Sequence, residues 1–81
     1  MEKMVGKVIN IHNSTVLKYY LTGSRRDGYS VSIIQKNGTE QLYAKCENIT
    51  RSAIRANDLF RKLSRGMVFP EQLPEIVADQ I

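Results

Sequence analysis

The spacing of apolar residues changes once along this 81-residue chain. Up to about residue 46, apolar and polar residues tend to alternate, which is typical of strands with one buried face. Between residues 47 and 66 the apolar residues recur every three or four positions, which is typical of an amphipathic helix. The sequence therefore predicts a single α+β domain in which a small sheet precedes the helices.

We expect an antiparallel β-meander of three to four strands, at about residues 4–11, 16–22, 29–35 and 39–46. The alternation is weakest in the first of these segments. In the other three it predicts one buried face. The residues expected on that face are Leu17, Tyr19, Leu21, Tyr29, Val31, Ile33, Leu42, Ala44 and Cys46.

Three short segments are predicted to turn the chain between these strands. Asn13-Ser14 follows the first strand, and the segment GSRRDG at residues 23–28 supplies Gly, Ser and Asp to the second turn. Asn37-Gly38 lies between two alternating runs, where a type I′ hairpin requires two residues with positive φ. These turns predict hairpins between neighbouring strands.

A long amphipathic helix is expected at about residues 51–65, with Thr50 as its N-cap. Ile49 and Ile54 are spaced to form a hydrophobic staple, and Gly66 fits the left-handed position after the helix. The apolar stripe comprises Ile49, Ala53, Ile54, Ala56, Leu59, Phe60 and Leu63.

A short second helix is expected at about residues 73–80. Pro70 keeps the preceding residue out of helix, and Pro74 is compatible only with the first helical turn. The apolar side of this helix comprises Leu73, Ile76, Val77 and Ile81. Docking of this side against the domain would hold the tail in place.

The net charge of +4 is unevenly distributed. Residues 1–65 carry a balance of +7, whereas residues 66–81 contain three acidic residues and no basic ones. The basic side of the long helix comprises Arg51, Arg55, Lys62 and Arg65, and the acidic residues of the tail are Glu71, Glu75 and Asp79. These two groups are expected to pair, either within one chain or across a dimer.

The sequence gives little support for catalysis or for a cofactor. His12 is the only histidine and Cys46 the only cysteine, so an internal disulfide is impossible and a zinc site would need a second chain. No run of about 18 apolar residues is present, and the first residues do not match a secretory signal. We expect a cytoplasmic, non-enzymatic protein that binds no metal or cofactor and does not span a membrane.

Four short motifs stand out: the tyrosine-led strand at Tyr29, the Asn48-Ile49-Thr50 segment, the helical segment FRKL that ends at Leu63, and the ending VFPEQLPEIVAD from Val68 to Asp79. Together they resemble an uncharacterised bacterial family, domain of unknown function 6514. The likeness covers roughly residues 16–81. Ala78 stands where the family often has Glu. The resemblance implies the fold of that family and a bacterial, cytosolic origin, and it leaves the function open.

These patterns favour a small binding or regulatory module that acts through protein–protein contacts and self-association. The residues expected to contact a partner are Arg51, Arg55, Lys62, Arg65, Phe69 and Leu73. The alternative is a nucleic-acid-binding protein, whose basic face would comprise Arg25, Arg26, Arg51, Arg55, Lys62 and Arg65. Exposed tyrosines among Tyr19, Tyr20, Tyr29 and Tyr43 would then stack on bases.

Overall fold

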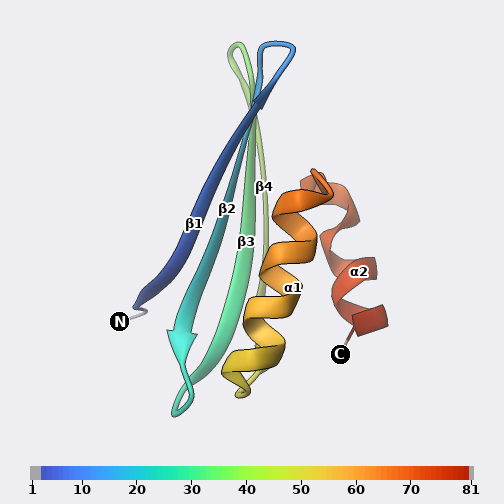
Figure 1. The fold of residues 1–81 in the computed structure, drawn as a ribbon. Coiled ribbons are helices and arrows are strands. Elements are labelled where there is room, and N and C mark those ends of the chain that lie inside the picture. Colours follow the sequence, from blue (N-terminus) through green and yellow to red (C-terminus); the bar gives the residue numbers. More distant parts are fainter. Residues whose placement is uncertain (1–2, 81) are drawn as a thin grey trace.

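The computed structural model describes residues 3–80 and confirms the α+β architecture (Figure 1). Four antiparallel strands form one sheet in the order β1-β2-β3-β4, which is a meander. The elements are β1 (Met4–His12), β2 (Thr15–Ser24), β3 (Gly28–Asn37), β4 (Glu40–Thr50), α1 (Ala53–Arg65), the 3₁₀ turn η1 (Pro70–Gln72) and α2 (Leu73–Gln80).

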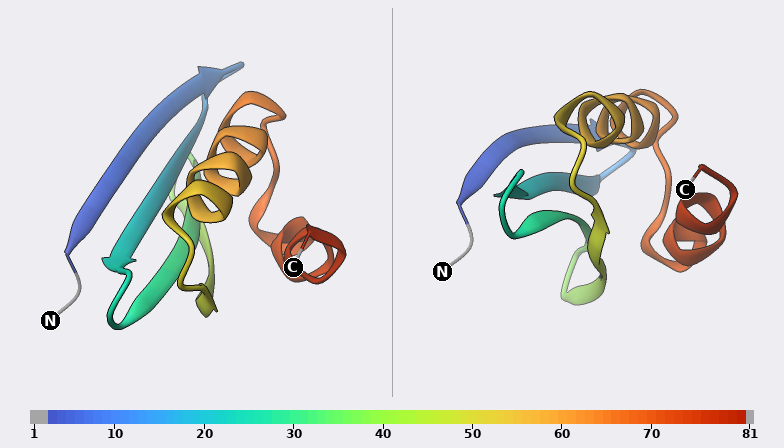
Figure 2. Two further views of the ribbon diagram at one scale, coloured as in Figure 1. Left: turned by 60° about the horizontal axis from the view of Figure 1, so that its bottom comes forward. Right: turned by 90° about the horizontal axis from the view of Figure 1, so that it is seen from below.

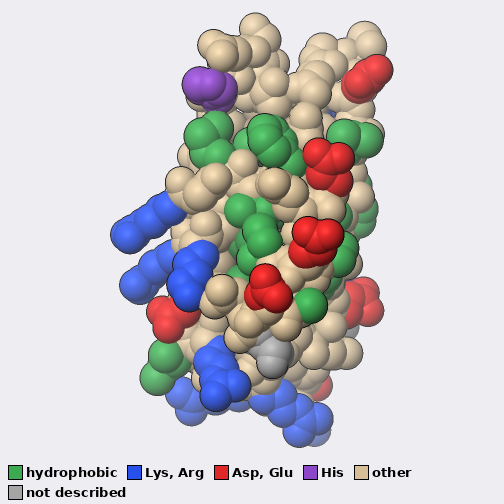
Figure 3. Space-filling view, turned by 90° about the vertical axis from the view of Figure 1, so that its right-hand side faces the viewer, with side chains coloured by type: hydrophobic (Ala, Val, Ile, Leu, Met, Phe, Trp, Pro, Cys, Tyr) green, Lys and Arg blue, Asp and Glu red, His purple; other side chains and the backbone are tan. Residues whose placement is uncertain are grey.

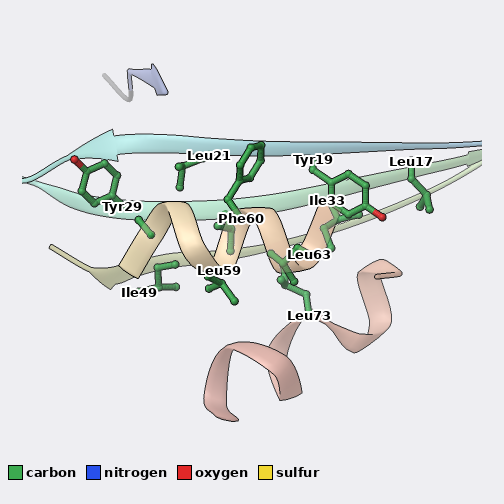
Figure 4. Packing of buried hydrophobic residues seen from close by; sticks show 12 residues of the cluster. Leu17, Tyr19, Leu21, Tyr29, Ile33, Ile49, Leu59, Phe60, Leu63 and Leu73 are labelled. Atoms are coloured by element: carbon green, nitrogen blue, oxygen red, sulfur yellow. The ribbon is translucent and has the colours of Figure 1, made fainter. Parts of the chain in front are cut away.

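Both helices lie on the same side of the sheet, as the three ribbon views agree (Figures 1 and 2). Helix α1 packs mainly across β2 and the two last strands, whereas α2 and η1 pack against β4. The sheet thus has an inner face beneath the helices and an outer face without a helical layer. The core lies between the inner face and α1 (Figure 4).

The alternating pattern of the strands and the helical spacing that follows it together predicted this core. The buried apolar side chains are Leu17, Tyr19, Leu21, Tyr29, Val31, Ile33, Ile49, Ala56, Leu59, Phe60, Leu63 and Leu73. Two predicted core residues are exposed instead. Leu42 retains 51% of its accessible surface, and Ile54 retains 75%.

The junction between sheet and helix differs from the prediction. Strand β4 continues to Thr50, because Thr50 pairs with Tyr29 across an irregularity in the β3–β4 register. The N-cap is Ser52, whose hydroxyl accepts a hydrogen bond from the Arg55 amide at 3.3 Å. Ile49 therefore remains in the sheet, and the predicted staple to Ile54 does not form.

The end of α1 also differs in one residue. Gly66 has helical φ of −81°, and Met67 adopts the left-handed conformation with φ of +50°. The Val68 amide then donates to the Leu63 carbonyl at 3.2 Å, which is the long hydrogen bond of a Schellman motif. This geometry returns Val68 to the core, where it packs against the buried cluster.

The two outer hairpins turn as expected, with one shift of position. Asn13 and Ser14 both have positive φ, at +48° and +68°, as a type I′ turn requires. In the β3–β4 hairpin, Asn37 pairs with Glu40, so the two-residue loop is Gly38-Thr39 rather than Asn37-Gly38. Only the first loop residue has positive φ, a position at which glycine is favoured.

The tail docks through its first helical residue. Helix α2 begins at Leu73, as predicted, and the Leu73 side chain is completely buried. Ile76 and Val77 are partly buried against the same cluster, whereas Ile81 lies outside the described residues. Two side-chain hydrogen bonds also join the sheet to the end of α1: Asn10 Nδ2 donates to the Ser64 carbonyl at 2.7 Å, and the Tyr19 hydroxyl donates to the Val68 carbonyl at 3.0 Å.

Truncation of Leu73 should destabilise the whole domain. Because this side chain is fully buried, Leu73→Ala is expected to lower the free energy of unfolding by about 2–5 kcal/mol. The matched control is Ile54→Ala, which removes a largely exposed side chain and should change stability by less than about 0.5 kcal/mol. Urea denaturation followed by circular dichroism measures both, and similar losses in the two variants would contradict the docking of the tail.

Stability should also fall at high pH because of Tyr19. Burial raises the pKa of its hydroxyl from 10.0 to about 12, and the hydrogen bond with Asn10 acts in the opposite direction. Between these two pH values the folded state keeps a proton that the unfolded state loses. The contribution of the Tyr19 hydroxyl to the free energy of unfolding is therefore fully present below pH 10.0 and is lost as the pH rises to about 12. The drop in unfolding free energy across this range should be smaller in Tyr19→Phe, and an identical drop would refute the assignment.

Candidate interaction surfaces

The two residues considered for nucleophilic chemistry lie at opposite edges of the sheet. His12 ends β1, and Cys46 lies in β4 with two strands between them. Three strand spacings separate these edges by about 14 Å, which is too far for direct proton transfer. Burial raises the pKa of the Cys46 thiol, which keeps it protonated at neutral pH.

The acidic residues of the tail do not form a metal cluster. Within residues 3–80, no three His, Cys, Asp or Glu side chains are grouped so that they could hold a metal ion. Glu71, Glu75 and Asp79 are all exposed along η1 and α2. They are therefore available as charged surface groups.

The basic residues of the long helix are also exposed. Arg51 precedes α1, whereas Arg55, Lys62 and Arg65 lie within it. Lys62 Nζ donates to the Gln80 side chain at 2.8 Å, which joins α1 to α2. Figure 3 shows acidic side chains gathered beside basic ones on this side of the molecule. The name helical face is used below for Arg51, Arg55, Lys62, Arg65, Glu71, Glu75 and Asp79.

The pairing of these charges within one chain is not found. In the part of the chain that the structure describes, no ion pair joins Glu71, Glu75 or Asp79 to the basic residues of α1. The two groups lie next to each other on one face and still point into solvent.

The six basic residues proposed for nucleic-acid binding are divided between two ends of the molecule. Arg25 and Arg26 lie in the loop between β2 and β3, at the same end as the start of α1 (Figure 1). Lys62 and Arg65 lie in the last turn of that helix, which is about 20 Å long. Arg51 and Arg55 lie near the start of α1, so the six residues are spread along the length of this helix.

The two apolar residues expected to contact a partner have different environments. Leu73 is completely buried in the core, so its role in the monomer is packing. Phe69 retains 39% of its accessible surface, next to the turn that leads into α2. Of this pair, Phe69 is the residue that offers apolar surface to a partner.

A shallow groove runs between β1 and α1. Its volume is about 520 Å³, and its polar lining includes His12, Arg61 and Arg65. Asn10 and Ser64, which also line it, are already joined by the hydrogen bond from Asn10 to the Ser64 carbonyl. The groove is thus partly closed by a contact that supports the fold.

The outer face of the sheet was not singled out from the sequence, and no helix covers it within residues 3–80. The register places four lysines, two tyrosines and four aliphatic residues on it, here called the sheet face. These residues are Lys7, Lys18, Lys36, Lys45, Tyr20, Tyr43, Ile9, Ile11, Val16 and Ile34. The signal was the alternation itself, since each core residue implies a neighbour on the opposite face.

This arrangement sorts the four tyrosines into two pairs. Tyr19 and Tyr29 lie on the inner face and are buried, which excludes them from stacking on a ligand. Tyr20 and Tyr43 lie on the sheet face, and Tyr43 retains 59% of its accessible surface.

Comparison with known families gives one match. The model of DUF6514, described as a family of unknown function, matches residues 2–81. The chain belongs to the DUF6514 family. The match extends the resemblance to the first strand, which the motifs from residue 16 onward did not cover. No curated protein and no solved structure was found to match the chain.

The motifs that resemble DUF6514 serve mainly the fold. Tyr29, Ile49, Leu63, Pro70 and Leu73 are all buried in the structure. They connect the sheet, the long helix and the tail, so they identify an architecture rather than a ligand site. Within the described residues, no helix of this DUF6514 member is long and apolar enough to cross a membrane.

Proposed function

We propose that the protein is a non-catalytic binding module that acts through protein–protein contacts, and that it self-associates through the helical face. The observation that supports this proposal is that the acidic and basic side chains of the helical face do not form ion pairs with one another. Acidic side chains of η1 and α2 lie beside basic side chains of α1, yet no ion pair joins them within residues 3–80.

A surface with adjacent groups of opposite charge is complementary to itself. In a dimer with two-fold symmetry the same patch is used by both subunits. If the axis passes between the two groups, the basic group of each subunit faces the acidic group of the other. A single chain therefore carries both halves of the contact.

The association is expected to be weak and sensitive to salt. Exposed ion pairs contribute about 0–1 kcal/mol each and are screened by salt. Phe69 and Ile54, with 39% and 75% of their surface accessible, add apolar area near the two ends of α1. Such a contact suits a module whose assembly depends on its concentration.

Charge reversal on the two groups separately should test this arrangement. Arg55→Glu/Lys62→Glu changes the charge balance of the helical face from +1 to −3, and Glu71→Lys/Glu75→Lys changes it to +5. Because two-fold symmetry repeats each change, each variant should weaken its own self-association by roughly tenfold or more, about 1.4 kcal/mol. An equimolar mixture of the two variants should associate again, because the acidic face of one then meets the basic face of the other.

Sedimentation equilibrium at low salt measures the masses, with thermal unfolding as the check that each variant folds. The matched control is Lys36→Glu, a charge reversal on the sheet face, which should leave the mass distribution unchanged. A wild-type protein that stays monomeric at low salt and high concentration would refute the proposal. So would a mixture of the two reversed variants that associates no better than either alone.

A further inference from the structure

The sheet face is open because the chain supplies helices to one side of the sheet only. Its aliphatic residues on β1 are well exposed, with Ile9 at 48% and Ile11 at 73% of accessible surface. Cross-strand pairing continues this surface from β1 onto β2, since Ile11 lies opposite Val16 and Ile9 lies opposite Lys18. The result is an apolar area interspersed with lysines rather than a purely charged one.

Each of the four strands places one lysine on this face: Lys7, Lys18, Lys36 and Lys45. Lys45 is already partnered, because the Glu47 carboxylate lies 3.5 Å from its Nζ. The cations that this face offers to a ligand are therefore Lys7, Lys18 and Lys36. A surface with this balance attracts polyanions, because each neutralised phosphate releases a bound counterion.

The tyrosines lie among these lysines. Tyr43 lies opposite Ile34, which lies opposite Lys18, so ring, aliphatic side chain and cation form one row across three strands. In the next row, Lys7 Nζ lies 5.8 Å from the centre of the Tyr20 ring. Exposed rings surrounded by cations are the elements with which proteins bind unpaired bases and their phosphates together.

Charge complementarity separates this occupant from the others. A second copy placed face to face would bring two sets of four lysines together, which is repulsive. A DNA or RNA duplex offers phosphates but keeps its bases stacked inside, so Tyr43 and the isoleucines would gain no contact. A single strand offers phosphates and exposed base surfaces at once.

We propose that the sheet face binds single-stranded nucleic acid, with Lys7, Lys18 and Lys36 neutralising phosphates and Tyr43 stacking on a base. The surface and the partner class are different from those of the helical face. The four strands span about 14 Å from β1 to β4, which suits a strand lying across the sheet.

Fluorescence anisotropy with a labelled single-stranded oligonucleotide of about 16 nucleotides tests this proposal in the intact protein. Three phosphate contacts predict a slope of about −2 for the logarithm of the binding constant against that of the salt concentration. Absence of binding at about 50 mM salt would overturn the proposal.

Two variants of equal net charge locate the binding surface. Lys18→Gln/Lys36→Gln removes two charges from the sheet face, and Arg25→Gln/Arg26→Gln removes two from the exposed loop between β2 and β3, which belongs to neither proposed surface. The first variant should reduce the steepness of the salt dependence by about 1.4, whereas the second should leave it close to the wild-type value. The reverse result would assign binding to that loop and overturn the proposal.

Tyr43→Leu distinguishes stacking from charge alone, because it keeps an apolar side chain at an exposed position. Affinity for the single strand should fall roughly tenfold. An unchanged affinity would contradict the assignment to unpaired bases.

Competition identifies the partner class. Unlabelled single strand should displace the probe at much lower phosphate concentration than duplex does. If duplex competes equally well, the face binds phosphates without reading bases, and the proposal fails. If polyglutamate at equal charge concentration competes as well as the single strand, the partner is an acidic protein instead.

Discussion

Burial of one face of the sheet beneath the last third of the chain is the constraint on which the rest of the structure depends. Tyr19, Leu21 and Ile33 are fully buried only because α1 and the α2 segment cover them. Within residues 3–80 both helices lie on this side, so the opposite face of the sheet carries no helical layer. The division between a core-facing side and an uncovered side of the sheet follows from this placing of the helices.

The alternation of β2 and β3 was sufficient to predict the inner face, since Leu17, Tyr19 and Leu21 are all buried. Errors occurred where tertiary geometry chose between two local possibilities. Thr50 and Ser52 are both suitable N-cap residues for α1. Because Thr50 pairs with Tyr29, it belongs to β4, and Ser52 is the residue that caps the helix. At the end of α1, the bond from Val68 to the Leu63 carbonyl placed the left-handed residue at Met67, one position after the glycine.

The candidate surfaces were predicted less completely than the core, for a physical reason. Charged residues on a helix have long flexible side chains, and sequence spacing does not say whether two rows of them meet. Glu75 and Arg55 thus have the right signs for a contact that the monomer does not make. The sheet face required the register of all four strands, because Lys18, Ile34 and Tyr43 become neighbours only through pairing between strands that the sequence cannot align.

The two proposed contacts use opposite sides of the molecule, so they are geometrically compatible. A dimer formed through the helical face would turn both sheet faces outward, on the far sides of the assembly. Each would then carry its own set of four lysines without bringing like charges together. In such a dimer, a nucleic acid strand bound to one sheet face would meet the other sheet face at a raised effective concentration, provided that the nucleic acid is long enough to pass around the dimer. Weak self-association would thereby increase the affinity of the protein for a long polyanion without any new contact on the sheet face.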